Sequence, residues 1–128
     1  MELTEPPRDI LEWLKLIELS YDIPAIMIED VHSLYGMSAK SNFRFGYNVG
    51  MINTLAECTD IPIEKVQPKV WQKHIGIQSK GKEIKKEVAE FCKKLYPKAD
   101  IYTKRNSLLD GRSDSLMIAH YAMCNYKL

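Results

Sequence analysis

The chain has 128 residues, of which 45% are hydrophobic and 27% charged, which suits one soluble domain and excludes two ordinary domains or a membrane span of about 20 apolar residues. The acidic, proline-containing start does not resemble a targeting peptide, and three widely separated cysteines disfavour structural zinc and a disulfide framework, so we expect a cytoplasmic protein. The net charge of +1 combines −7 in residues 1–64 with +8 in residues 65–105, which predicts either a surface that meets a polyanion or an ordinary solvated lysine face.

The first half of the chain alternates predicted helices and strands. Residues 7–20 carry apolar side chains at helical spacing, with Pro7 in the first turn. The short apolar run IPAIMIE predicts a buried strand that ends at Glu29. A polar loop over residues 30–42 then leads to a helix over roughly residues 42–58.

The second half is mostly helical. IPIEKVQP predicts another short strand, and Pro68 opens a short helix in KVWQKHIG. Residues 80–95 predict a strongly amphipathic helix, with lysines outside and four apolar residues inside: Ile84, Val88, Phe91 and Leu95. A last helix begins at about Asp110.

The order of these elements predicts an α/β protein with an unusually small sheet. A strand–helix–strand step implies a parallel pair joined by a right-handed crossover. Parallel sheets need cover on both faces and are usually wider than two strands. We therefore expect that part of the sheet is missing from the predicted elements.

Three acidic residues lie at the ends of predicted elements. Glu29 ends the first strand, and ligands in open α/β sheets bind beyond the carboxyl ends of strands. Asp110 and Asp114 begin the last helix, and carboxylates are the ligands that Mg²⁺ prefers. Each also has an ordinary explanation: Asp110 as a helix N-cap, Asp114 as a partner of the helix dipole, and Glu29 as a solvated strand end.

Five segments occur in an order that resembles the phage-type RuvC Holliday junction resolvases: IMIEDVHS, NFRFGYNVGMI, VQPKVWQKHIG, GKEIKKEVAEFCKKLYP and DGRSDSLMIAHY. The resemblance covers the chain from about residue 20 to residue 122. It implies a single nuclease domain over residues 1–128 with an RNase H-like, three-layer fold. In this chain the fold would be incomplete, with a reduced parallel sheet flanked by helices.

The resemblance also implies an activity and its residues. Such enzymes are homodimers that cut four-way junctions or other branched DNA in the cytoplasm of a bacterium or phage-infected host, using Mg²⁺, or Mn²⁺, held by carboxylates. Glu29 matches the family's strand-end glutamate, and Asp114 matches the aspartate before the small-apolar helix. The other late position falls on Gly111, so Asp110, one residue earlier, is the candidate for it. The expected catalytic and metal-binding residues are therefore Glu29, Asp110 and Asp114.

The chain departs from this family before Glu29. The family opens with a strand that carries an aspartate within a three-strand meander, and no such segment precedes Glu29 here. We expect either a truncated or split resolvase, or strands supplied by another chain. The alternatives are a catalytically inactive branched-DNA-binding module and a purely structural protein whose lysines are solvated.

Two segments are candidates for DNA contact. Lysines before and along the amphipathic helix would neutralise phosphates without reading bases, and the predicted set is Lys69, Lys73, Lys80, Lys82, Lys85 and Lys86. The loop after Glu29 adds His32, Tyr35 and Lys40, where an aromatic ring could stack on an unpaired base. The ordinary interpretation of this loop is a variable surface segment. Trp71 is expected to pack in the core rather than to stack on a base. His120 is expected to be a packed or surface residue rather than a catalyst.

Overall fold

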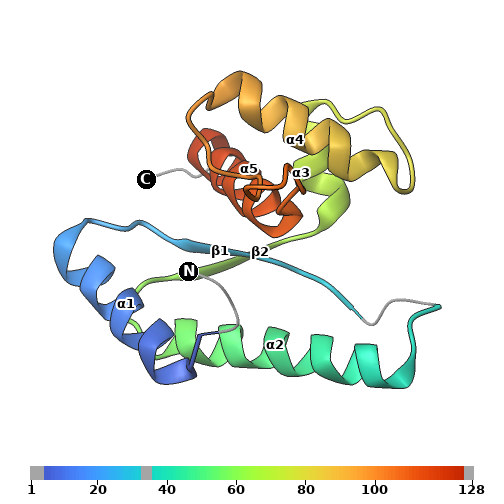
Figure 1. The fold of residues 1–128 in the computed structure, drawn as a ribbon. Helices are drawn as coiled ribbons and strands as arrows, with labels where there is room; N and C mark the ends of the chain where they lie inside the picture. Colours follow the sequence, from blue (N-terminus) through green and yellow to red (C-terminus); the bar gives the residue numbers. More distant parts are fainter. Residues whose placement is uncertain (1–4, 33–35, 126–128) are drawn as a thin grey trace. The chain divides into compact units, whose positions relative to one another are not determined.

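The computed structural model describes residues 5–32 and 36–125 of the chain (Figure 1). The chain forms two compact units, unit 1 (Met1–Lys65) and unit 2 (Val66–Leu128). Within the described residues there are five helices and a two-stranded parallel sheet. The predicted mixed α/β class is therefore confirmed.

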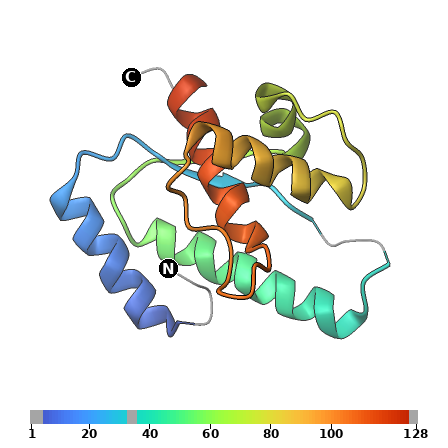
Figure 2. The ribbon, with the colours of Figure 1, turned by 45° about the horizontal axis from the view of Figure 1, so that its top comes forward.

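Unit 1 contains two helices and the sheet. Its elements are α1 (Pro7–Ser20), β1 (Ile26–Glu29), α2 (Ala39–Glu57) and β2 (Ile63–Val66), whose last residue already belongs to unit 2. Helices α1 and α2 contact each other, and Figures 1 and 2 both show them as neighbours. The helix predicted over residues 7–20 is confirmed at both ends.

Helix α2 begins three residues earlier than its apolar spacing suggests. The backbone N–H of Ser41 donates to Oγ of Ser38 at 3.1 Å, so Ser38 is the N-cap residue and helical geometry begins at Ala39. A serine side chain satisfies one of the first backbone N–H groups of a helix, which stabilises a start at that position. The helix therefore includes residues that the sequence analysis predicted to lie in the loop.

The sheet is shorter than its apolar runs. Each strand has four residues, and the backbone N–H of Ile26 donates to the carbonyl of Pro62 at 2.8 Å beside the paired strands. All four residues of β1 are half-buried. Glu29 is the last residue of β1, as the sequence predicts.

Unit 2 is a cluster of three helices, α3 (Pro68–Ile75), α4 (Glu83–Leu95) and α5 (Asp110–Asn125). Helix α5 packs against both α3 and α4, and α4 and α5 lie side by side in Figures 1 and 2. Helix α3 begins with a proline and is capped by Gly76, whose φ of 92° is a left-handed conformation that glycine adopts without a steric penalty.

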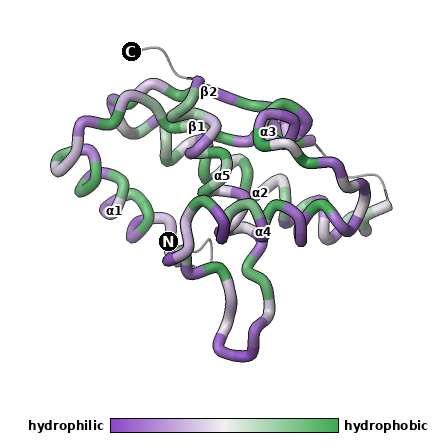
Figure 3. Tube along the Cα trace, turned by 90° about the horizontal axis from the view of Figure 1, so that it is seen from above, coloured by the Kyte–Doolittle hydropathy of each residue, from purple (hydrophilic) through white to green (hydrophobic). Residues whose placement is uncertain are grey.

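The core of unit 2 is formed by side chains with almost no exposed surface: Trp71, Val88, Cys92, Ile101 and Met117. In Figure 3 the tube of α4 changes repeatedly between hydrophilic and hydrophobic residues, which is typical of a helix with one packed face. The prediction that Leu95 points inward is wrong, because its side chain is 45% exposed. It is the last residue of α4, and Val88, Ala89 and Cys92 supply the buried face instead.

The segment between α4 and α5 is fixed at both ends. Nζ of Lys93 donates to the carbonyls of Pro97 and Ala99 at 2.9 and 2.8 Å, which holds the chain as it leaves α4. The backbone N–H of Leu109 donates to the carbonyl of Ile101 at 2.7 Å just before α5. The start of α5 is thereby anchored to the buried Ile101. In the part of the chain that is described, no helix is long and apolar enough to cross a membrane.

Candidate metal and nucleic-acid site

The two late carboxylates lie in the first turns of α5. The carbonyl of Leu109 accepts hydrogen bonds from the backbone N–H groups of Arg112 and Ser113, so Asp110 is the first residue inside the helix rather than its N-cap. Asp114 is four residues further on, and residues at this spacing share one side of a helix. Both aspartates are half-buried. Local helix geometry therefore brings these two predicted residues together.

Asp110 has a partner on the neighbouring helix. Oδ2 of Asp110 lies 2.9 Å from Nζ of Lys85 on α4, and the Lys85 and Asp110 side chains are 65% and 42% exposed. An ion pair with this much exposure contributes at most about 1 kcal/mol to stability, because water screens both charges. Its importance is its position, since it joins a predicted DNA-contacting lysine to a predicted metal ligand.

The other predicted lysines of unit 2 are all exposed to solvent. They come from α3, from the loop before α4 and from α4 itself: Lys69, Lys73, Lys80, Lys82 and Lys86. Lys93 differs from them because its ammonium group is used within the fold, where it holds two carbonyl groups.

The predicted residues of unit 1 follow β1 and begin α2. Glu29 is half-buried at the end of β1, and His32, three residues later, is exposed. Lys40 is exposed in the first turn of α2. Tyr35 lies outside the described residues.

Glu87 is a polar residue of α4 whose contacts the sequence does not indicate. Helical spacing would allow it to pair with a lysine of the same helix. Instead its carboxylate accepts hydrogen bonds from the backbone N–H groups of Gln78 and Ser79 and from the Ser79 hydroxyl. These bonds, the one from the Gln78 backbone foremost, hold the pKa of Glu87 below its ordinary value. The only sequence signal for this contact is a serine eight residues upstream, which is too weak to predict it.

His120 is a packed residue, which is one of the two environments that the sequence left open for it. Its Nδ1 lies 2.7 Å from the Tyr96 hydroxyl, and the two rings meet edge to face with centroids 5.8 Å apart. His74 lies next to it, with ring centroids 6.5 Å apart. Trp71 is also confirmed as a core residue, with no exposed surface.

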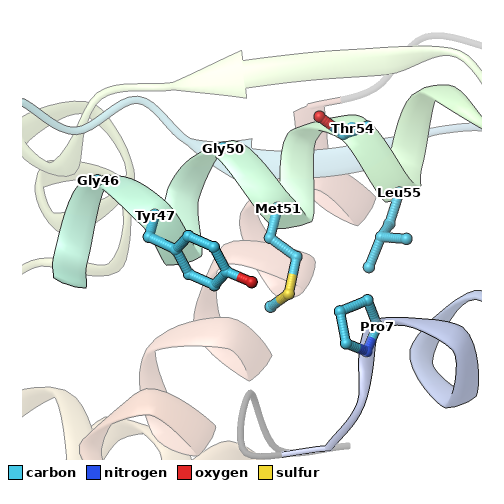
Figure 4. Close-up of a pocket in the computed structure, with 7 residues that line it drawn as sticks. All are labelled: Pro7, Gly46, Tyr47, Gly50, Met51, Thr54 and Leu55. Carbon is cyan, nitrogen blue, oxygen red and sulfur yellow. The ribbon is translucent and has the colours of Figure 1, made fainter. Parts of the chain in front are cut away.

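Unit 1 also has an open apolar groove of about 480 Å³ between the start of α1 and one side of α2 (Figure 4). Its described lining consists of Pro7, Gly46, Tyr47, Gly50, Met51, Thr54 and Leu55. Among the described residues, this lining supplies neither carboxylates nor cations.

The carboxylates at the start of α5 are groups of the kind that bind a magnesium ion. Mg²⁺ is commonly bound by one or two carboxylates together with water and substrate phosphate, and Asp110 and Asp114 supply two carboxylates from one side of α5. Over residues 5–32 and 36–125, no group of three or more acidic, histidine or cysteine side chains is arranged to hold a metal ion.

No protein-family model matches the chain, and no curated protein is significantly similar to it.

Proposed function

We propose that this chain is a structure-selective endodeoxyribonuclease that binds branched DNA, above all four-way junctions, and hydrolyses phosphodiester bonds with a divalent metal. The observation that best supports the proposal is the ion pair between Lys85 and Asp110. It joins the lysine-bearing helix to the carboxylate-bearing helix within one unit. A metal-dependent nuclease needs both kinds of group beside one phosphate, because cations hold the DNA and carboxylates hold the metal.

The lysines give the protein affinity for DNA without sequence selection. Lys82, Lys85 and Lys86 are exposed around the first turn of α4, and Lys73 is exposed on α3. Flexible ammonium groups contact phosphates and carry no base information, which suits a protein that recognises a branched shape. His32 and Lys40 are the proposed contacts from unit 1.

The carboxylates have a separate role. Asp110 and Asp114 would hold Mg²⁺ or Mn²⁺. A bound divalent ion supplies Lewis-acid stabilisation of the charge that develops on the phosphate during hydrolysis. Asp110 would hold the ion in place of the Lys85 ammonium group, which would leave Lys85 available for a DNA phosphate.

A homodimer is part of the proposal, because resolving a four-way junction requires two cuts related by an approximate two-fold axis. The resemblance to RuvC-type resolvases supports both the fold, of RNase H-like type, and this assembly.

The test is a cleavage assay with synthetic DNA. The wild-type chain is incubated with a labelled four-way junction and with a linear duplex of the same sequence, each with Mg²⁺, Mn²⁺ or EDTA. The proposal predicts metal-dependent nicks in the junction only. Asp114→Asn should abolish these nicks, whereas Asp22→Asn, which removes an exposed carboxylate from the segment after α1, should keep them. Junction binding without cleavage would favour the inactive DNA-binding module instead.

A further inference from the structure

The loop between α3 and α4 carries two of the proposed DNA-contacting lysines, Lys80 and Lys82. Both side chains are exposed, whereas Ser79 next to them is half-buried. The loop begins at the end of α3, where the backbone N–H of Ile77 donates to the carbonyl of Gln72 at 3.0 Å. Ile77 is half-buried at the start of the loop, but the stretch from Gln78 to Lys82 has no apolar side chain to fix its path, so a polar contact must do so.

The side chain of Glu87 provides this anchor. The backbone N–H of Gln78 donates to Oε1 of Glu87 at 2.5 Å, and the backbone N–H of Ser79 donates to Oε2 at 3.2 Å. The Ser79 hydroxyl donates to Oε2 at 2.8 Å. One carboxylate on the second turn of α4 therefore holds two consecutive residues of the loop, directly before Lys80.

The other end of the loop is held by the helix itself. The backbone N–H of Ile84 donates to the carbonyl of Gly81 at 3.2 Å, and Gly81 has a φ of 60°, in the left-handed region that favours glycine. Lys80 thus lies between two fixed positions, Ser79 and Gly81. Hydrogen bonds to an ionised carboxylate are stronger than those between neutral groups, so the anchor is well suited to this task.

We propose that Glu87 is a positioning residue for DNA binding, which holds the Gln78–Gly81 loop so that Lys80 and Lys82 are preorganised for phosphate contact. This inference rests on the proposed function. Ordering a flexible loop at the moment of binding costs conformational entropy, so a loop without this anchor would leave its lysines in solution instead of in contact with phosphates. Glu87 contacts no DNA in this account and acts only through the loop.

If Glu87 positions the loop, its removal should change DNA affinity in the direction opposite to that expected from its negative charge alone. Removing any carboxylate near the DNA should strengthen binding, because it removes repulsion from the phosphates. Removing Glu87 should weaken binding instead, because the loop loses its anchor. Glu90, an exposed carboxylate one turn further along α4, is the matched control.

The experiment compares Glu87→Ala and Glu90→Ala in the full chain. Affinity for a labelled four-way junction is measured by fluorescence anisotropy across a range of KCl concentrations, and thermal melting is followed by circular dichroism. Each phosphate that a lysine neutralises adds about 0.9 to the slope of log K against log salt. For each phosphate contact that is lost in Glu87→Ala, we therefore expect the affinity for the junction to fall about eightfold at about 0.1 M salt. The salt slope should fall by about one, whereas Glu90→Ala should bind as well as wild type or better.

A purely structural role for Glu87 would lower the melting temperature and leave the salt slope of the folded protein unchanged, and this result would overturn the inference. Equal affinities of the two variants would also overturn it. If Glu87→Ala does not fold, Ser79→Ala removes one of the same hydrogen bonds without a charge change and should weaken binding in the same direction; unchanged binding would refute the role. A wild-type chain with no salt-dependent junction binding would refute the proposed function itself.

Discussion

The ammonium nitrogen of Lys85 lies 2.9 Å from Oδ2 of Asp110, so a lysine of α4 is paired with the first carboxylate of α5. The two residues are 25 positions apart in the chain and meet because α4 packs against α5. In the proposed enzyme this pair occupies Asp110 until metal and DNA arrive. The Lys85 ammonium group should therefore compete with the metal ion for Asp110, and removing it should change the metal affinity measurably.

The first prediction concerns that competition. Lys85→Gln removes the ammonium group, so we expect Mn²⁺ to bind up to about fivefold more tightly, which corresponds to the upper limit of about 1 kcal/mol for an exposed ion pair. Junction affinity should fall in the same variant because one ammonium group no longer meets a phosphate. Mn²⁺ binding is measured by electron paramagnetic resonance of the free ion. Lys86→Gln, its exposed neighbour on α4, is the control and should weaken DNA binding while leaving the Mn²⁺ affinity unchanged.

The second prediction concerns Gly111, which occupies the position where resembling resolvases carry an acidic ligand. A Cβ atom added at Gly111 meets no atom within 4 Å, so the first atom of a side chain fits there without rearrangement. Gly111→Asp should leave the free energy of unfolding unchanged or raise it by about 1 kcal/mol, because aspartate suits the first turn of a helix. It should also tighten Mn²⁺ binding.

Gly111→Asn separates these two effects, since it adds nearly the same volume without the charge. Urea unfolding measures stability, and titration measures Mn²⁺ affinity. Equal metal affinities of the aspartate and asparagine variants would show that this turn of α5 does not hold the ion.

The third prediction concerns the cysteines. Cys92 has no exposed surface, and burial raises the pKa of its thiol, so the reactive thiolate is scarce at neutral pH. Cys58 and Cys124 are exposed. Ellman's reagent should therefore label two thiols rapidly in the folded chain and the third only in denaturant. Rapid labelling of Cys92 in native buffer, read by mass spectrometry of its peptide, would contradict the packing of α4.

The fourth prediction concerns Trp71, which is fully buried and whose indole Nε1 has no hydrogen-bond partner among the described residues. Trp71→Ala should lower the free energy of unfolding by about 3–5 kcal/mol, as is usual for a large buried aromatic residue. Trp71→Phe should cost much less, because it keeps most of the apolar volume and removes the unpaired N–H. Urea denaturation measures both. Similar losses in the two variants would contradict this interpretation of the indole.

The fifth prediction is a pH dependence from Glu87. Its pKa is lowered in the folded state from an ordinary value of 4.5, so the folded protein favours the ionised form. The stability that Glu87 supplies is therefore fully present above pH 4.5 and is lost as the pH falls through the folded-state pKa. The difference in unfolding free energy between wild type and Glu87→Gln should be constant near neutrality and shrink on acidification. A difference that grows at low pH would have the wrong sign.

The helices could be predicted from the sequence because their signals are local. Pro7 and the apolar spacing after it define α1, and Pro68 with Gly76 brackets α3 to within one residue. Apolar spacing places the start of α2 too late, because the Ser38 cap lies within a stretch of loop-like composition. It also misplaces Leu95, because helical periodicity does not indicate where the packing partner of a helix ends.

For the candidate site, the sequence predicts where single residues lie along the helices and strands, but not which residues contact one another. The positions of Glu29, Asp110 and Asp114 at the ends of elements follow from the sequence, and the structure agrees. The contacts between elements do not follow from it. The pairing of Lys85 with Asp110 depends on helix packing, and the anchoring of the loop by Glu87 depends on a turn whose path no motif specifies.

The central claim is that the start of α5 holds a divalent ion beside the lysines of α4, and paramagnetic NMR tests it most directly. Trace Mn²⁺ is added to the ¹⁵N-labelled chain, and the broadening of each backbone amide signal is recorded. The account predicts that residues 110–114 broaden first, that excess Mg²⁺ restores their signals, and that Asp114→Asn removes the effect. Broadening that is centred on unit 1 instead, or that is unchanged in Asp114→Asn, would contradict this metal site.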